Sequence, residues 1–289
     1  MILIFGCGIL GRHLLRALDS AGETILAVTR QEIPAGSARV QRRVCDVRSG
    51  QDLADLAAFC GSEPLTVFYF AAQHNIDAVF DDPSAARAVN VEGLRRFLSC
   101  GLNIRKLFFA STDCVYGEND EAHPCFTEDD PLRPVNEYGR QKAEAEEIVR
   151  ENGFTVLRFP FLFGPSLSEK PNFYDSSVSR LQSGETIDMI DGMTRSALSY
   201  RTAAELLVRL SAPELLPAQT INVCGDRGFT KYEIGLLLAE KTGCPASLVR
   251  KLTMQEGRRF FRDARADCAC MDNAKLKQLL HIAQITLEV

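Results

Sequence analysis

The feature that most constrains the fold is a glycine-rich turn, Gly6-Cys7-Gly8-Ile9-Leu10-Gly11, near the start of the chain. Residues 2–5 before the turn are apolar, and residues 13–18 after it carry apolar side chains at helical spacing. In a strand, Gly-x-Gly-x-x-Gly and helix unit, the glycines allow a tight turn, close approach of a pyrophosphate and close helix–strand packing. The pattern predicts a dinucleotide-binding turn formed by Gly6, Gly8, Ile9, Leu10 and Gly11, with a purely structural turn as the alternative.

Apolar runs typical of buried strands recur along the chain, separated by segments with helical spacing. They cover residues 2–5, 24–29, 40–47, 66–72, 106–110 and 154–160. This alternation predicts an α/β fold, a doubly wound parallel sheet of the Rossmann type with helices on both faces. Beyond Pro165 the predicted elements become short and loops frequent. We therefore expect an NAD(P)-binding domain at 1–165 and a smaller, substrate-binding C-terminal lobe at 166–289.

Two motifs in the middle of the chain predict a site for acid–base chemistry. Ser111 and Thr112 directly follow the apolar run at 106–110, and open parallel sheets bind ligands beyond the carboxyl ends of their strands. Tyr138 and Lys142 lie four residues apart in a helix-forming segment, so their side chains share one helix face. A nearby ammonium and the helix N-terminus would both favour the phenolate form of Tyr138. Such a phenol can donate a proton to a carbonyl oxygen while hydride reaches the carbon.

Ser-Thr-Asp-x-Val-Tyr-Gly at 111–117 and Tyr-Gly-x-x-Lys at 138–142 resemble the extended branch of the short-chain dehydrogenase/reductase superfamily, the NAD-dependent epimerase/dehydratase family. The resemblance covers essentially the whole chain and implies activity on a nucleotide sugar. It implies three catalytic residues, Thr112, Tyr138 and Lys142. It also implies three substrate contacts, Ser111, Asp113 and Arg195. A solvated surface position is the alternative for Arg195.

The same resemblance implies an NAD(P) cofactor that the glycine turn and the ends of the following strands would bind. The further cofactor contacts are Asp46, Ala71, Ala72, Tyr138, Lys142 and Phe161. A strand-end cap is the alternative for Asp46, and ordinary core packing is the alternative for Phe161. The glycine spacing departs from the Gly-x-x-Gly-x-x-Gly of the branch, because Phe5 stands where the first glycine would be.

Arg30 directly follows the second predicted strand, where the adenosine ribose should lie. An NAD enzyme normally has an acid there for the ribose hydroxyls, whereas an arginine can bind a 2′-phosphate through two parallel hydrogen bonds. We therefore favour NADP(H), bound through Arg30 with Arg12 as a helper. NAD(H) is the alternative, because Glu32 is close in the sequence.

Three features favour a reductase similar to dTDP-4-dehydrorhamnose reductases within this branch. The chain is short for an epimerase, Cys114 stands where 4,6-dehydratases carry glutamate, and residues 265–276 resemble the reductase ending without its Arg-Pro pair. The predicted reaction is NAD(P)-dependent reduction of a keto group of a nucleotide sugar. A nucleotide-sugar 4-epimerase and a non-catalytic NAD(P)-binding regulatory subunit are the alternatives.

Composition and charge narrow the expected partners. The 289-residue chain has a net charge of −5, which gives no basic footprint for nucleic acid. No apolar stretch approaches the roughly 20 residues that span a bilayer, and the first residues lack a signal-peptide pattern. The ten cysteines are scattered without a Cys-x-x-Cys pair. We therefore expect no metal site and reduced thiols in a cytoplasmic protein, with a homodimer as a candidate assembly.

Overall fold

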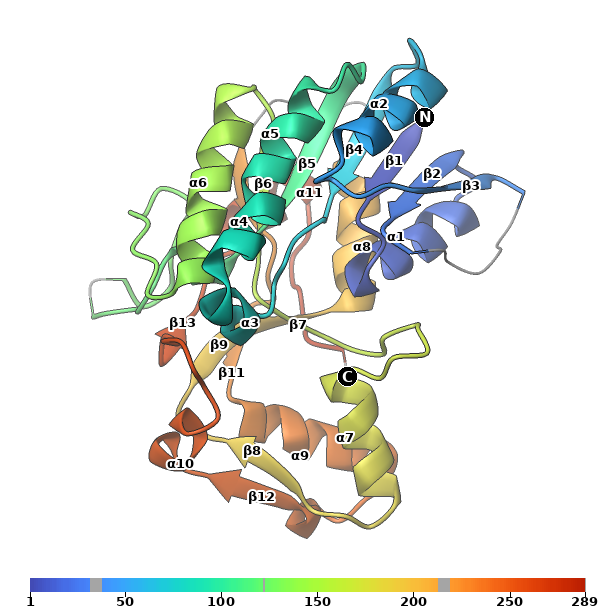
Figure 1. The fold of residues 1–289 in the computed structure, drawn as a ribbon. Coiled ribbons are helices and arrows are strands. Elements are labelled where there is room, and N and C mark those ends of the chain that lie inside the picture. Colours follow the sequence, from blue (N-terminus) through green and yellow to red (C-terminus); the bar gives the residue numbers. More distant parts are fainter. Residues whose placement is uncertain (32–37, 122, 213–218, 289) are drawn as a thin grey trace.

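The computed structural model describes residues 1–31, 38–121, 123–212 and 219–288 (Figure 1). Its centre is a seven-stranded sheet in the order β10-β6-β5-β4-β1-β2-β3, in which every neighbouring pair is parallel. This order confirms the predicted doubly wound sheet of the Rossmann type. The strands are β1 (Ile2–Phe5), β2 (Ile25–Thr29), β3 (Val40–Val44), β4 (Leu65–Tyr69), β5 (Ile104–Thr112), β6 (Thr155–Phe159) and β10 (Thr220–Asn222).

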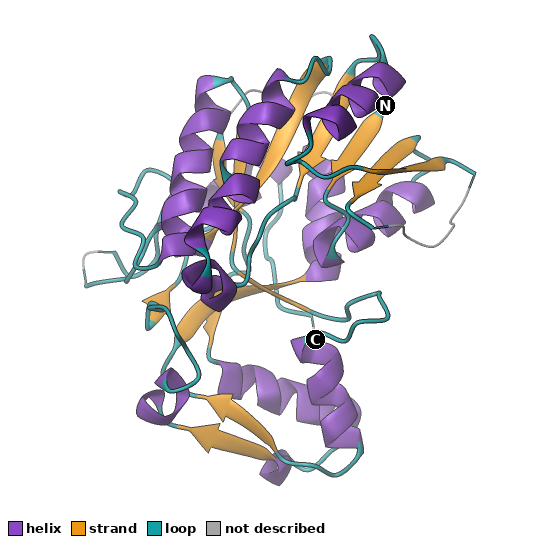
Figure 2. Cartoon of the chain, in the orientation of Figure 1, coloured by secondary structure: helices purple, strands orange, loops and turns teal. Residues whose placement is uncertain are grey.

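Helices cover both faces of this sheet, because its central strands carry apolar side chains on both sides (Figure 2). One face packs against α1, α8 and α11, with Leu14 and Leu207 fully buried there. The other face packs against α2, α5 and α6, with Phe97 and Ile148 in that core, and α3 and α4 precede α5. The bounds are α1 (Ile9–Ser20), α2 (Gly50–Cys60), α3 (Ile76–Asp81), α4 (Pro83–Asn90), α5 (Glu92–Ser99), α6 (Glu137–Glu151), α8 (Tyr200–Leu210) and α11 (Ala274–Leu280).

The third strand is shorter than the predicted run at 40–47, since β3 ends at Val44. The chain turns at Asp46, whose side-chain Oδ1 accepts from Arg48 N and whose carbonyl accepts from Ser49 N, each at 2.9 Å. An aspartate that bonds to the backbone two residues later favours a turn over a continued strand.

A smaller lobe lies below the sheet in Figure 1 and has its own core, which includes Leu181, Met189 and Leu238. It consists of α7 (Phe173–Gln182), β8 (Ile187–Ile190), α9 (Lys231–Thr242), the 3-10 turn η2 (Ala246–Leu248), β12 (Val249–Leu252) and α10 (Met254–Arg258). Between the lobes runs a small sheet of β7 (Phe161–Phe163), β9 (Thr194–Ser199), β11 (Gly228–Phe229) and β13 (Cys268–Ala269).

The chain crosses between the two lobes more than once. It leaves the large sheet after β6, which ends at Phe159, but α8, β10 and α11 all lie beyond the predicted boundary at 165 and pack with this sheet. Among the helices of the described ranges, none combines the length and apolarity that crossing a bilayer requires.

Candidate active site

A large cavity opens at the carboxyl ends of β1, β4, β5 and β6, where open α/β sheets bind their ligands. Its volume is about 1510 Å³, which exceeds the ~300–1,000 Å³ typical of a pocket for one small molecule. Every predicted site residue lines it except Asp46 and Lys142. Those that line it are Gly6, Gly8, Ile9, Leu10, Gly11, Arg30, Ala71, Ala72, Ser111, Thr112, Asp113, Tyr138, Phe161 and Arg195.

The glycine turn forms one end of this cavity. Gly6 has a φ of 100°, and a Cβ at this position would lie 2.4 Å from the amide nitrogen of Ala71. A Cβ on Gly11 would lie 2.9 Å from the Gly6 carbonyl oxygen, so the two glycines keep α1 close to β1 and β4. A Cβ on Gly8 would meet nothing within 4 Å, so this part of the turn is open. The turn and the N-terminus of α1 therefore fit the pyrophosphate of a dinucleotide.

At the end of β5, the Thr112 side chain lies at the cavity, whereas the Ser111 hydroxyl bonds to a buried carboxylate. Ser111 Oγ donates to Oε1 of the buried Glu146 at 2.5 Å. Thr112 Oγ1 donates to Asp113 Oδ1 at 3.1 Å and accepts from Cys114 N. Successive side chains of a strand point to opposite faces, which explains why the two neighbours differ.

Tyr138 lies in the first turn of α6, as the sequence predicts. Asn136 caps this helix by accepting from Gly139 N at 2.8 Å. Tyr138 lines the cavity and is 8% exposed. Burial raises the pKa of the Tyr138 phenol, and Cys114 and Asp113 raise it further. The phenol therefore holds its proton at neutral pH.

Lys142 lies one turn further along α6 and is buried behind the cavity wall. Its ammonium donates to the Ala110 carbonyl at 2.5 Å and lies 3.8 Å from the centre of the Phe109 ring. Burial lowers the pKa of Lys142 to about 7, and Glu146 partly opposes this shift. In this arrangement one N–H of Lys142 bonds to the Ala110 carbonyl, and Lys142 is not among the groups that shift the pKa of Tyr138, so its stabilisation of a Tyr138 phenolate stays a prediction.

A buried polar network that sequence reasoning missed lies behind the site. Arg158 of β6 donates to both carboxylate oxygens of Glu146 at 2.7–3.2 Å and to the Tyr116 hydroxyl at 2.6 Å. The Tyr116 hydroxyl donates in turn to Asn222 Oδ1 of β10 at 2.7 Å. Glu146 is 0% exposed and Arg158 is 2% exposed. The sequence signal was Arg158 inside the apolar run at 154–160, but Glu146 is one of several glutamates in a polar helix, so nothing in the sequence singled it out as the partner.

Arg195 of β9 reaches the cavity beside Asp113 and Cys114. Its Nε lies 3.5 Å from Asp113 Oδ2, and its Nη2 lies 3.7 Å from Cys114 Sγ. Both Arg195 Nε and Asp113 Oδ2 are shielded from solvent, and neither has a hydrogen-bond partner among the described residues. The solvated-surface alternative for Arg195 is therefore wrong. Burial raises the pKa of the Cys114 thiol, although Arg195 partly opposes this shift.

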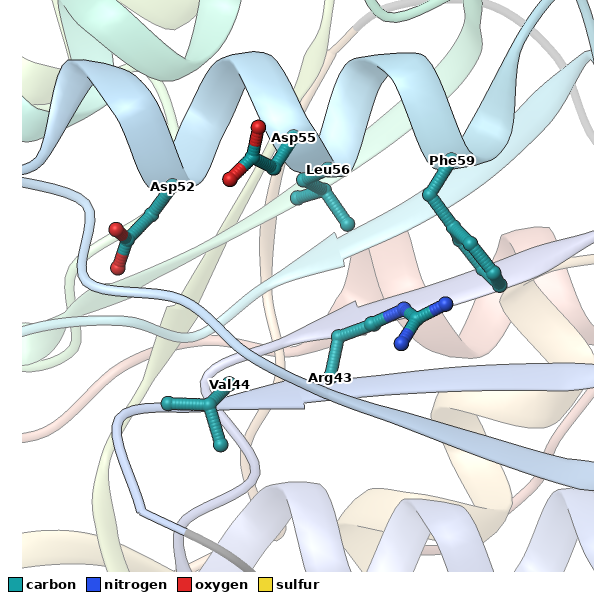
Figure 3. Close-up of a pocket in the computed structure, with 6 residues that line it drawn as sticks. All are labelled: Arg43, Val44, Asp52, Asp55, Leu56 and Phe59. Atoms are coloured by element: carbon teal, nitrogen blue, oxygen red, sulfur yellow. The ribbon is translucent and has the colours of Figure 1, made fainter.

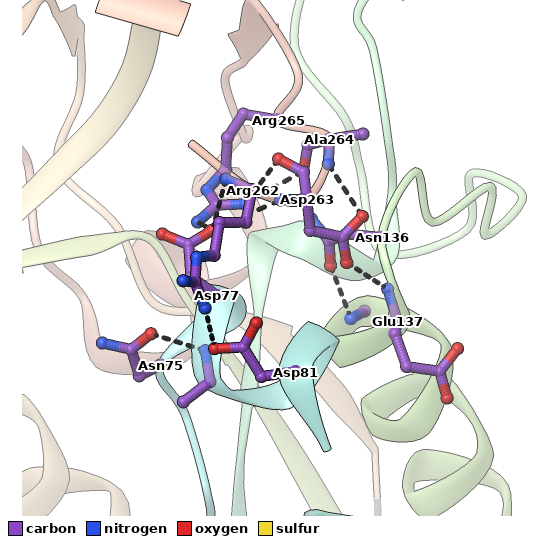
Figure 4. A network of polar contacts seen from close by, with 11 residues as sticks. Asn75, Asp77, Asp81, Asn136, Glu137, Arg262, Asp263, Ala264 and Arg265 are labelled. Carbon is purple, nitrogen blue, oxygen red and sulfur yellow. Dashed lines mark hydrogen bonds and ion pairs between the residues drawn. The ribbon is translucent and has the colours of Figure 1, made fainter. Parts of the chain in front are cut away.

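The first turn of α6 is also capped from the C-terminal part of the chain (Figure 4). Glu137 N donates to Asp263 Oδ2 at 3.1 Å, and Asn136 Nδ2 donates to the Ala264 carbonyl at 3.1 Å. The helix that carries Tyr138 is thus held at its start by a segment more than 120 residues away.

The same segment binds α3, as Figure 4 also shows. Arg265 Nη2 donates to Asp77 Oδ1 at 2.8 Å, and Arg262 pairs with Asp81. Two arginines from the far end of the chain therefore face acids of α3, close to Ile76 at the cavity wall.

The residues predicted to lie near the adenosine part of the cofactor do not all reach the cavity. Arg30 is exposed and lines the cavity at the end of β2, and Arg12 lines it from α1. Asp46 does not line it. Arg48 binds the Asp46 carboxylate at 2.6–3.2 Å and lowers its pKa to about 2. Glu32 lies outside the described residues.

A second hollow, of about 480 Å³, lies between β3 and α2 (Figure 3). Arg43 stacks over the Phe59 ring there at 3.9 Å from its centre, and Asp52 and Asp55 lie on the α2 side. None of the predicted site residues lines it, so the large cavity is the site candidate. Within the described ranges, no three His, Cys, Asp or Glu side chains come together in a way that could hold a metal ion.

The sequence matches one family model and is similar to several known proteins. Residues 2–210 match the NAD dependent epimerase/dehydratase family. The chain is 27% identical to methionine adenosyltransferase 2 subunit beta of Bos taurus over 75% of its length, and it spans 66% of that relative. It is 26% identical to the probable low-salt glycan biosynthesis reductase Agl14 of Haloferax volcanii, over 97% of this chain and 92% of that protein.

Solved structures share the fold along the full chain. UDP-glucose 4-epimerase of Thermus thermophilus, in complex with NAD, superposes with a TM-score of 0.81, 21% identity, and coverage of 100% of this chain and 95% of that one. The dTDP-glucose 4,6-dehydratase DesIV of Streptomyces venezuelae, also with NAD, gives a TM-score of 0.79, 20% identity, and coverage of 100% and 93%. With the matched family covering most of the described sheet, this chain belongs to the NAD-dependent epimerase/dehydratase family.

Proposed function

We propose that this protein is an NAD(P)-dependent oxidoreductase that reduces a keto group of a nucleotide sugar, in the manner of dTDP-4-dehydrorhamnose reductases. The observation that carries the proposal is the meeting of the glycine turn, Thr112 and Tyr138 at one cavity. The near full-length similarity to a protein named as a reductase supports the reductive direction.

When bound at the glycine turn, the reduced cofactor supplies hydride to the carbonyl carbon. Tyr138 is the proton donor to the carbonyl oxygen, because burial keeps its phenol protonated. Thr112 Oγ1 would hold the same oxygen within reach of Tyr138 by donating its hydroxyl hydrogen, which bonds to Asp113 Oδ1 in this structure and has to turn toward the substrate. Lys142 has two ammonium donors besides the one on the Ala110 carbonyl, and its buried side chain would have to turn toward the cavity to contact the nicotinamide ribose. Asp113 and Arg195, which also line the cavity, would bind the substrate.

The surroundings of Cys114 argue against a dehydratase. Elimination needs a base next to the substrate. The Cys114 thiol is 5% exposed, and burial raises its pKa, so it holds its proton at neutral pH. Reduction needs no such base, since Tyr138 and the cofactor suffice.

Two other functions have specific support. A nucleotide-sugar 4-epimerase shares this fold, and such enzymes are among the similar structures. A regulatory subunit is supported by the similarity to methionine adenosyltransferase 2 subunit beta, of which the match spans 66%. The chain keeps Thr112 and Tyr138, and both line the cavity, which favours an enzyme over a regulatory subunit.

The test is a turnover assay with NADPH or NADH and a panel of 4-keto nucleotide sugars. We expect the absorbance of the reduced cofactor to fall in proportion to the alcohol formed. Interconversion of UDP-sugars without net consumption of cofactor would favour the epimerase. Binding of cofactor without turnover on either panel would favour the regulatory subunit.

We propose NADP(H) as the preferred cofactor, because Arg30 lines the cavity at the end of β2. Loss of a charged hydrogen bond costs about 1.5–3 kcal/mol, so Arg30→Ala should weaken NADPH roughly 10- to 150-fold and leave NADH nearly unchanged. The measurement is the dissociation constant of each cofactor. Arg48→Ala is the control, because the Arg48 side chain binds Asp46 and does not line the cavity. Equal losses for both cofactors would contradict the assignment of Arg30. The cytoplasmic location and the homodimer remain predictions. So does the assignment of cofactor binding to residues 1–165 and of substrate binding to residues 166–289.

A further inference from the structure

Three of the ten free cysteines come together where two distant segments of the chain pair. One segment is the loop between β5 and α6, and the other contains and follows β13. Phe126 N donates to the Cys270 carbonyl at 2.9 Å, and Asp272 N donates to the Phe126 carbonyl at 2.8 Å. These two bonds form a parallel bridge between Phe126 and Met271. The register therefore sets Cys125 directly opposite Cys270.

This pairing has the geometry that a disulfide needs. Paired strands lie about 4.7–4.9 Å apart, which falls inside the roughly 4.4–6.8 Å that separates the Cα atoms of bridged cysteines. Residues opposite each other in a ladder also point their side chains to the same face. Partial burial raises the pKa of the Cys125 thiol, and its contact with the Cys270 thiol opposes part of this shift, so the two thiols are neighbours.

Cys268 is the third thiol of the group, two residues before Cys270 in the same extended segment. Burial raises the pKa of Cys270 to about 12, and the nearby Cys268 and Cys125 thiols add to the shift. Alternate residues of a strand share a face but lie about 6.4–6.8 Å apart along it. Their Cβ atoms keep this spacing, which exceeds the roughly 3.5–4.5 Å of a disulfide. Cys268 is therefore a neighbour of the Cys125 and Cys270 pair and not a member of it.

The two segments are already fixed against each other with all thiols free. The Glu118 carboxylate accepts from Asp267 N and Cys268 N, both at 2.7 Å. Asn119 Oδ1 accepts from Cys270 N at 2.5 Å, and Asn119 N donates to the Cys268 carbonyl at 2.9 Å. A covalent bond between the segments therefore needs no rearrangement of the backbone.

We propose that Cys125 and Cys270 are a reversible modification site, at which a small-molecule disulfide oxidises the two thiols to a disulfide bond. Cys125 is exposed and Cys270 is buried, so Cys125 reacts first. Its thiolate attacks one sulfur of the small disulfide, whose S–S bond breaks and whose other half leaves as a thiolate. Cys270 then gives up its proton and attacks Cys125 Sγ, which releases the second half. The two cysteines lose two electrons and two protons, and the small disulfide gains them as two thiols.

The position of this bond gives it a consequence for α6. The segment that carries Cys270 begins just after Asp263 and Ala264, which cap the start of that helix. The loop that carries Cys125 leads directly into the same helix. Oxidation would therefore tie both attachments of the first turn of α6 together. The proposal rests on this pairing alone and is independent of the proposed function.

The test is treatment of the full chain with millimolar glutathione disulfide under native conditions, followed by a count of free thiols in denaturant and an intact-mass measurement. In wild type the count should fall by two from the ten thiols of the sequence, without added glutathione mass, and dithiothreitol should restore it. Cys125→Ser should keep all its remaining thiols. Cys244→Ser, which removes a partly exposed thiol elsewhere, should lose two thiols as wild type does. An unchanged count in wild type, or a glutathione adduct that persists on Cys125, would overturn the proposal.

The melting temperature tests the pairing separately. Oxidised wild type should melt roughly 4–10 °C above the reduced protein, because the bond closes a long loop of the unfolded chain and fits the native backbone. Cys125→Ser should melt at the same temperature with and without glutathione disulfide. Cys268→Ser should keep both the bond and the shift. Loss of the bond in Cys268→Ser, or a lower melting temperature of oxidised wild type, would contradict the assignment of Cys125 and Cys270 as partners.

Discussion

Two ion pairs, one behind the cavity and one at its wall, differ in how completely they are bonded. Glu146 and Arg158 lie behind the catalytic strand, share three contacts of 2.7–3.2 Å and bind further partners, among them Ser111 and Tyr116. Asp113 and Arg195 lie at the cavity wall, 3.5 Å apart, and each keeps one buried polar atom without a described hydrogen-bond partner. A buried group without a partner is costly. We call Glu146 and Arg158 the closed pair and expect it to stabilise the fold. We call Asp113 and Arg195 the open pair, and under the proposed function it is the pair that meets a ligand.

The largest expected effect falls beside the open pair, at Tyr138. Tyr138→Phe should reduce turnover about 10²- to 10⁴-fold, because it removes the general acid. Cofactor affinity and the free energy of unfolding should change little. Steady-state kinetics, together with a cofactor titration as the control, measure this. A variant that keeps more than roughly a tenth of the wild-type rate would remove Tyr138 from the mechanism.

Breaking the closed pair should cost stability instead. Glu146→Ala leaves the Arg158 guanidinium buried without its carboxylate, and we expect a loss of about 3–5 kcal/mol in the free energy of unfolding. Urea denaturation measures it. Glu147→Ala is the matched control, because Glu147 is the exposed neighbour on the same helix. A loss under about 1 kcal/mol, as at a surface pair, would contradict the assignment of the pair as a stabilising one.

Breaking the open pair should affect ligand affinity more than folding. Arg195→Met should weaken binding of a nucleotide sugar roughly 10- to 150-fold and cost about 1–3 kcal/mol of stability, less than Glu146→Ala. Arg201→Met, whose exposed side chain lies at the start of α8, serves as the control. If Arg195→Met destabilised the protein as much as Glu146→Ala and left affinity intact, the two pairs would have the same role.

The smallest effect per step of the measurement, here one pH unit, is a pH dependence that Lys142 contributes from beside the closed pair. The pKa of Lys142 falls from 10.5 to about 7 on folding, so between these values the unfolded chain holds a proton that the folded protein has released. Raising the pH through this window should therefore stabilise the folded state, by at most about 1.4 kcal/mol per pH unit. The measurement is the free energy of unfolding of wild type minus that of Lys142→Met between pH 7 and 10. A difference that stays flat or falls with pH would contradict the low pKa.

The predictable parts of this molecule depend on local sequence. The glycine turn, the run of apolar strands and the Asn136 start of α6 follow from residues that lie next to one another, so their types and order were enough. The end of β3 at Val44 was missed because the side chain of Asp46 bonds to the backbone of Arg48, and apolar spacing carries no record of such a bond.

The parts that could not be predicted depend on pairs distant in the sequence. Arg265 and Asp77 are 188 residues apart, and the sequence around each residue gives no sign that the other is its partner. Lys142 was correctly expected on the helix face of Tyr138, but its bond to the Ala110 carbonyl is set by the packing of α6 on β5. Helical spacing decides which residues share a face, whereas packing depth decides whether the ammonium meets a phenol or a carbonyl.

The cap that Asp263 places on α6 also orders events during synthesis. Glu137 leaves the ribosome 126 residues before its partner, which is about 6–25 s at roughly 5–20 residues per second. Through that interval the sheet from β1 to β6 can assemble, while the first turn of α6 lacks one of its caps. A nascent chain in this state forms the glycine turn early and fixes the position of Tyr138 late. Under the proposed function, it should therefore bind a dinucleotide before it can catalyse the reduction.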